Sequence, residues 1–291
     1  MNRLREYMMF ALTTGLGVAA SLLRSRRLAT GNQYRSTGRH AHALPVLVGV
    51  WLVLCSNFVL AESVSAPVSA SEQPLQEVFQ SELVYPQEAG EVQVTFAPQF
   101  HDGAEAKRWE LPVTVEYGVT DDLQVELEWK AYVRDDRDDE PATDGIGDIE
   151  IGLQYSWMRI KGSRFHAAAG VEVGIPTGDE DKQLGEGDAS IEPYGIFAAD
   201  LPDDRGQLFV HAGIEFSNDV DEPFVNIGGF VPMGDVVVTA EWNWSEEQRF
   251  LTPGLVWQSE KSWEFGIGVP IGLNDASDDY RVIVLAIYEI N

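Results

Sequence analysis

The stretch LQVELEW, from Leu123 to Trp129, alternates strictly between apolar and polar side chains. Its odd-numbered positions hold leucine, valine, leucine and tryptophan, whereas its even-numbered positions hold glutamine and two glutamates. Successive side chains of a β-strand point to opposite faces, so a period of two predicts a strand with one apolar and one charged face.

The same alternation continues on both sides of this stretch, from Glu91 to the end of the chain. A soluble β-sandwich also alternates, but its strands are usually about 5 to 6 residues long. Most of these segments approach the roughly 9 to 11 residues that a tilted strand needs to cross a membrane. The predicted strands, of which the sixth and the eighth are the weakest, cover residues 92–100, 109–117, 123–133, 149–157, 165–175, 189–199, 208–216, 224–231, 236–244, 251–257, 263–273 and 280–290.

The two faces of these strands differ in charge. The apolar phase carries no charged residue, which suits contact with hydrocarbon, where Lys or Arg costs about 2 to 4 kcal/mol at mid-depth. The opposite phase is expected to face a lumen, and its acidic excess predicts a preference for cations, with polar filling of the barrel as the alternative. The lumen-facing candidates are Glu116, Glu126, Glu128, Lys130, Arg134, Asp148, Glu150, Glu172, Glu192, Glu215, Glu241, Glu264 and Arg281.

The connections between strands alternate between longer acidic loops and short turns. Long outer loops and short inner turns are typical of bacterial outer-membrane barrels, and twelve strands return the chain to the side where the first began. Tryptophans near both strand ends fit the aromatic girdles at the two membrane interfaces. The sequence therefore predicts an all-β, antiparallel up-and-down barrel of about 12 strands in the outer membrane of a Gram-negative cell. Its expected partners are outer-membrane lipids and the barrel-assembly machinery.

Composition excludes several other classes. The 47 acidic residues against 20 basic ones give a formal charge of −27, and such a surface repels nucleic acid. The single cysteine, Cys55, allows neither an internal disulfide nor a cysteine metal cluster. Leu54 in front of it disfavours a lipoprotein, which needs a small residue there.

The N-terminal part reads as an export region over residues 1–61. Its second apolar stretch, residues 43–61, ends with Val59 and Ala61, which fits signal cleavage before Glu62. The alternative is a retained anchor, because about 18 apolar residues just span a bilayer. Residues 62–90, rich in Ser, Ala, Pro and Gln, are expected to form a periplasmic lead-in, and residues 91–291 the barrel.

Two passages carry a family resemblance: GIGDIEIGLQYSW at residues 145–157 and GVEVGIPTGDEDKQLGEGDASIEPYGIFAADL at residues 170–201. They resemble the outer-membrane barrel family named for the meta pathway of phenol degradation. The resemblance implies a barrel that moves hydrophobic compounds across the outer membrane. The chain departs from most such barrels at its end, where Ile290 and Asn291 stand in place of a final Phe or Trp.

No motif predicts a cofactor, a metal centre or a catalytic site. The run Pro176-Thr177-Gly178-Asp179 lacks the lysine and the following helix of a phosphate loop. The acidic loops 135–144 and 179–188 are read as solvated charge, with Ca²⁺ binding as the alternative. The favoured function is a narrow channel or transporter for a small solute. A structural or stress-related barrel without transport is the second hypothesis, and the third is a surface enzyme, for which His101, His166 or His211 would need an oriented partner.

Overall fold

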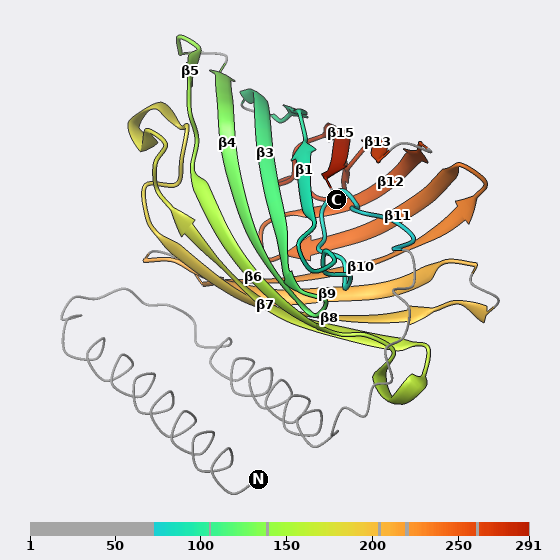
Figure 1. The fold of residues 1–291 in the computed structure, drawn as a ribbon. Coiled ribbons are helices and arrows are strands. Elements are labelled where there is room, and N and C mark those ends of the chain that lie inside the picture. Colours follow the sequence, from blue (N-terminus) through green and yellow to red (C-terminus); the bar gives the residue numbers. More distant parts are fainter. Residues whose placement is uncertain are drawn as a thin grey trace, which may run out of the picture. The chain divides into compact units, whose positions relative to one another are not determined.

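The alternating segments pair into one antiparallel sheet that closes on itself. The computed structural model describes residues 73–104, 106–137, 140–202, 205–218, 221–259 and 262–290. The export region, its signal segment 43–61 and Cys55 lie outside the described residues. Successive crossings of the barrel wall pair with each other, and β1 pairs with β15, with Val92 opposite Ile290 (Figure 1). The fold is therefore a closed 12-strand antiparallel barrel, which confirms the fold predicted from the alternation.

The fifteen strands of the described residues make twelve crossings because three crossings are interrupted. The interruptions separate β1 from β2, β5 from β6 and β13 from β14. Pro98 and Pro270 stand in two of the gaps and offer no N–H to the ladder. The strands are β1 (Val92–Phe96), β2 (Gln99–Asp102), β3 (Ala106–Thr120), β4 (Leu123–Arg137), β5 (Thr143–Gly145), β6 (Ile149–Trp157), β7 (Phe165–Ile175), β8 (Ser190–Asp200), β9 (Gln207–Phe216), β10 (Asp221–Met233), β11 (Val236–Ser245), β12 (Arg249–Gln258), β13 (Trp263–Gly268), β14 (Ile271–Gly272) and β15 (Tyr280–Ile290).

The two 3₁₀ turns lie in connections, and no strand is replaced by helix. η1 (Ile160–Gly162) lies in the turn between β6 and β7, and η2 (Glu180–Lys182) lies in the long loop between β7 and β8. Among the described residues, no helix is long and apolar enough to cross a membrane.

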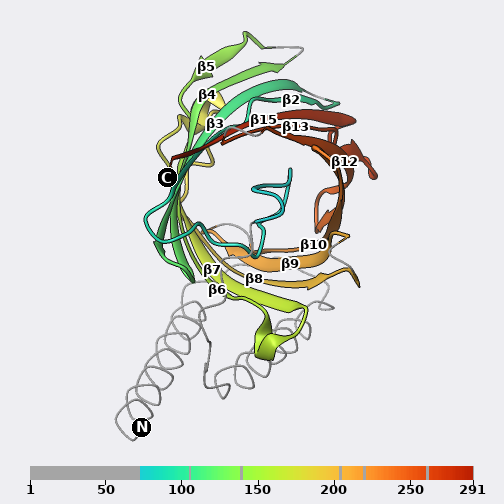
Figure 2. The same cartoon turned by 45° about the vertical axis from the view of Figure 1, so that its right-hand side comes forward.

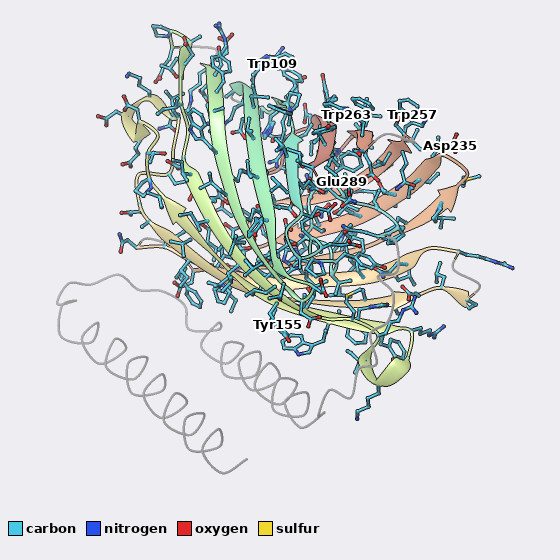
Figure 3. The ribbon with its side chains drawn as sticks, viewed as in Figure 1. Trp109, Tyr155, Asp235, Trp257, Trp263 and Glu289 are labelled. Atoms are coloured by element: carbon cyan, nitrogen blue, oxygen red, sulfur yellow. The ribbon has the colours of Figure 1, made fainter. Side chains whose placement is uncertain are left out.

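The outward face of the barrel is apolar along its whole height. Leu127 is 45% exposed, whereas the Glu126 and Glu128 side chains beside it are half-buried on the opposite face. Trp109 is exposed next to the outer loops, and Trp257 and Trp263 project outward at the rim that carries Asp235 (Figure 3). These rings form the two aromatic girdles expected where a barrel meets the two membrane interfaces.

Candidate functional site

A stretch without strand or helix, residues 73–90, lies mostly inside the barrel, and its exposed residues 88–90 lie at the rim beside the end of β3. We call it the inner segment; Figure 2 shows most of it in cyan within the ring of strands. The composition of residues 62–90 predicts a periplasmic lead-in, but residues of the inner segment find polar and apolar partners on the inner wall of the barrel. The sequence of the segment has no hydrophobic period, so it predicts neither a strand nor a helix and gives no sign of this position.

Polar side chains of the wall hold the backbone of the inner segment at several points. The Glu241 carboxylate, 1% exposed, accepts hydrogen bonds from the Phe79 N–H at 2.9 Å, the Gln80 N–H at 3.3 Å and the Ser81 hydroxyl at 2.6 Å. His211 Nδ1 accepts from the Glu82 N–H at 3.2 Å. Buried polar groups need such partners, so these hydrogen bonds stabilise one position of the segment. We call them the seat of the inner segment.

The last part of the inner segment is fixed near β3 and β4. The Gln87 side chain donates to Glu116 Oε2 at 2.9 Å and to Gln93 Oε1 at 3.0 Å, and its backbone N–H donates to Gln124 Oε1 at 3.0 Å. Gly90 N–H donates to the Gly118 carbonyl at 2.8 Å. The segment therefore continues into β1 along the wall of the barrel.

Apolar side chains of the inner segment fill the half of the lumen near the short turns. Each fully buried Val, Leu or Phe contributes about 1.5 to 3 kcal/mol relative to exposure to water. Sequence reasoning missed the inward apolar residues that receive them. Two runs of the sequence could have predicted these residues: VVV at 236–238 and IVLAI at 283–287. Both runs are apolar in both phases of the strand, which indicates that both faces of the strand are buried. The cluster comprises Leu75, Val78, Phe79, Leu83, Val84 and Tyr85 of the segment and Ala97, Ala168, Tyr194, Ile196, Ala198, Phe209, Phe230, Val237, Val256, Ile283, Leu285 and Ile287 of the wall.

The half of the lumen near the long loops is acidic instead. Seven carboxylates surround a cavity of about 90 Å³ there. Burial and, to a smaller extent, repulsion by the nearby Glu215 carboxylate raise the pKa of Glu186 in the outer loop. The cavity is lined by Asp148, Glu150, Glu172, Gly174, Ile175, Glu186, Asp188, Ser190, Glu192 and Glu215.

The thirteen lumen-facing candidates fall into three groups. Glu116, Glu241 and Glu264 hydrogen-bond to the inner segment, and Glu126 and Glu128 line a second cavity, of about 140 Å³, beside that segment. Two of the three basic candidates face the lumen and have an acidic partner there: Lys130 with Glu150 at 3.1 Å and Arg281 with Asp278 at 2.7 Å. The prediction for Arg134 is wrong, because a register shift in β4 between Lys130 and Tyr132 turns Val133 inward and places Arg134 opposite Trp109 on the outward face, where it pairs with Asp136 at 3.7 Å. The remaining candidates, Asp148, Glu150, Glu172, Glu192 and Glu215, line the outer cavity.

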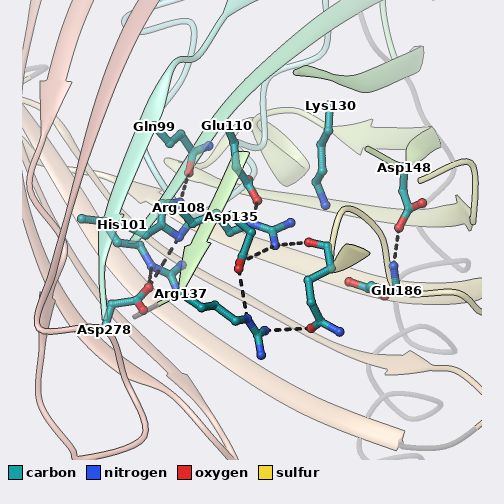
Figure 4. Close-up of polar contacts among 12 residues, drawn as sticks. Gln99, His101, Arg108, Glu110, Lys130, Asp135, Arg137, Asp148, Glu186 and Asp278 are labelled. Atoms are coloured by element: carbon teal, nitrogen blue, oxygen red, sulfur yellow. Dashed lines mark hydrogen bonds and ion pairs between the residues drawn. The ribbon is translucent and has the colours of Figure 1, made fainter. Parts of the chain in front are cut away.

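Ion pairs at the outer mouth connect β2 to the loop before β15, β2 to β3, and β3 to β4 (Figure 4). Asp135 lies 3.0 Å from Arg137 Nε and 3.6 Å from Arg108 Nη1. In the outer loop before β15, the hydrogen bond from His101, supported by the Arg281 guanidinium, lowers the pKa of Asp278 to about 2. Arg108 and Arg137 also donate to Gln183, in the loop whose Glu186 lines the acidic cavity, so these pairs join the rim to that loop.

The three histidines considered for catalysis have structural partners. His166 Nε2 lies 2.8 Å from Asp200 Oδ2, and its Nδ1 accepts from the Arg159 N–H. His211 supports the inner segment, and His101 pairs with Asp278 at 3.5 Å. Within the described residues, no group of three His, Cys, Asp or Glu side chains has an arrangement that would hold a metal ion.

A closed barrel with an apolar outer face, two aromatic girdles and a polar lumen defines the chain as an outer-membrane β-barrel. Within that class, the chain belongs to the family described as "Putative MetA-pathway of phenol degradation", whose family model matches residues 111–282. This confirms the resemblance found in the two glycine-rich passages. No curated protein matches the chain in sequence.

Two solved structures share the fold at low sequence identity. An outer membrane channel from Pseudomonas putida F1 is 13% identical, with a TM-score of 0.58, over 74% of this chain and 100% of that chain. The KdgM porin is 11% identical, with a TM-score of 0.50, over 68% of this chain and 99% of that chain. At this identity the likeness establishes a common architecture.

Proposed function

We propose that this protein is an outer-membrane channel for a small solute, closed at rest by its inner segment. The observation that carries the proposal is the position of residues 73–90 inside a closed barrel, held by hydrogen bonds and apolar packing. Such contacts are individually weak enough to break and re-form, as a gate requires. The two solved structures with this fold are described as an outer membrane channel and a porin, which supports the same class of function.

The outer cavity bears on the kind of solute that enters. Seven carboxylates around it, with Lys130 bonded to Glu150, create a negative potential in a confined space. A channel with this mouth admits cations and neutral molecules in preference to anions. The apolar half behind it favours solutes with apolar surface, so we propose a small neutral or cationic solute with an apolar part.

The test is electrical and osmotic. In planar bilayers, we expect the whole protein to be mostly closed and a variant lacking residues 73–89 to show a larger and steadier conductance, with faster entry of small solutes into liposomes. Leu251→Ala is the matched control, because it shortens an exposed outward side chain and leaves the lumen unchanged. If the deletion variant folds and is as silent as the whole protein, the chain is a structural barrel without transport.

A further inference from the structure

Phe79 lies flat against a part of the inner wall that has no side chains. A Cβ added to Gly254 or to Gly268 would overlap the Phe79 ring, and one added to Gly266 would lie 3.2 Å from its Cζ. Glycine inside a strand weakens the strand and often marks a close approach of another group. We call the surface formed by Gly254, Gly266 and Gly268 the glycine trough.

The register shows how the trough is framed. Thr239, Gly254, Gly268 and Ile283 form one row across β11, β12, β13 and β15. The next row toward the short turns is apolar, with Val237, Val256, Gly266 and Leu285. The next row toward the outer mouth begins with Glu241 and Thr252. The trough is therefore apolar on one side and polar on the other.

One polar atom at the edge of the trough lacks a partner. Thr239 Oγ1 is buried, in a residue 2% exposed, and makes no hydrogen bond to any of the described residues. It lies 2.5 Å from the position that a Gly254 Cβ would take, against the same ring edge of Phe79. A phenylalanine side chain has no atom that forms a conventional hydrogen bond with this hydroxyl. A buried polar group without such a bond destabilises the folded protein.

Phe79 borders free space as well as the trough. It lines the cavity of about 140 Å³, together with Ala97 and Leu285. This space can receive the ring when it leaves the trough. Its backbone N–H is held by Glu241, so leaving also loosens the seat of the inner segment.

We infer that the glycine trough is a binding site for the planar ring of a one-ring aromatic solute, which Phe79 occupies in the resting protein. A ring with a hydroxyl group binds best, because it gives Thr239 the partner that Phe79 cannot. Solute and Phe79 compete for the same place, so binding favours the displaced inner segment. The passage of solute rests on the proposed function, whereas the binding site stands independently of it.

Binding to the folded protein in detergent tests the site, with p-cresol and toluene as probes, since toluene is the phenylalanine side chain and p-cresol adds one hydroxyl. If Phe79 fills the trough about nine-tenths of the time, Phe79→Ala raises the affinity for p-cresol about tenfold. Leu251→Ala on the outward face is the matched control, because it leaves the inner segment and the trough unchanged, and it gives no such gain.

Two further variants separate the trough from unspecific uptake by the micelle. Adding Gly254→Ala or Gly268→Ala to Phe79→Ala fills the trough and should abolish the gain, with folding checked by migration on gels before and after heating. Adding Thr239→Val should lower p-cresol affinity about fivefold and leave toluene binding unchanged. Equal binding with a filled and an open trough overturns the proposal. Binding without solute flux in bilayers would leave this site standing and reject the channel.

Discussion

The two halves of the lumen share strands, β8 and β9 among them, but differ in what fills them. Near the long loops, carboxylates from β6, β7, β8 and β9 face a water-accessible cavity. Near the short turns, apolar side chains of β8 to β12 and β15 pack against the inner segment. The difference teaches that alternation decides which face of a strand points inward, whereas the position along the strand decides whether that face is wet or packed.

The largest expected effect tests the facing on which this comparison depends. Leu127→Arg places a charge on the outward face of β4 and should cost about 2 to 4 kcal/mol of folding free energy in a bilayer. Glu128→Arg is the matched control on the lumen side, and it should fold nearly as well. Folding yield in lipid vesicles measures both. A spin label at 127 should be reached by lipid-borne quenchers and one at 128 should not; equal quenching would remove the distinction between the faces.

The second prediction concerns the packed half. Glu241→Ala leaves the Phe79 N–H, the Gln80 N–H and the Ser81 hydroxyl without their acceptor. Loss of hydrogen bonds to a charged group costs about 2 kcal/mol, so the open probability in planar bilayers should rise about thirtyfold. Glu264→Ala serves for comparison, because it takes one 3.3 Å bond from the inner segment, that of the Gln76 N–H, and its other bond, from the Gln258 side chain at 2.7 Å, lies within the wall. An equal response from both variants would show that the seat at Glu241 has no special part in closure.

The third prediction concerns the acidic half. Each charge about 10 Å from a permeating ion in water contributes about 0.4 kcal/mol, or about a twofold preference. Glu192→Gln with Glu215→Gln should therefore lower the ratio of cation to anion permeability, measured from the reversal potential in a gradient of potassium chloride at low ionic strength. Asp221→Asn, at the exposed start of β10, removes a charge outside the cavity and should leave the ratio unchanged.

The smallest effect belongs to the outer rim. Because the folded pKa of Asp278 is lowered to about 2, its stabilisation is present above about pH 4 and is lost as the pH falls through 2. A partly exposed pair of this kind is worth at most about 1 kcal/mol. Protease resistance of the loop before β15 should therefore fall between pH 4 and pH 2 in the natural protein and stay level in Asp278→Asn. A parallel decline in both would assign the acid sensitivity to other groups.

Alternation along the chain was enough to predict the twelve crossings, the class of barrel and most of the facing. It was wrong at the end of β4, where a register shift that the pattern does not announce turns Val133 inward and Arg134 outward. Even the weak segments 189–199 and 224–231 form β8 and β10, because pairing on both sides compensates for a poor local pattern. The inner segment could not be predicted in the same way. Its partners are distant in sequence, as in the bond between Phe79 and Glu241, and its own residues follow no period. The glycines at 254, 266 and 268 were visible, but only the register shows that they face one ring.

The seam between β1 and β15 places the two ends of the barrel side by side, with Val92 opposite Ile290. A short turn joining these ends would make an ordinary hairpin, and new termini could be opened at the exposed turn of Gly234 and Asp235. In such a circular permutant, residues 73–90 are no longer part of the chain. The inner segment can then be added as a separate peptide, and its affinity for the lumen can be measured as a dissociation constant.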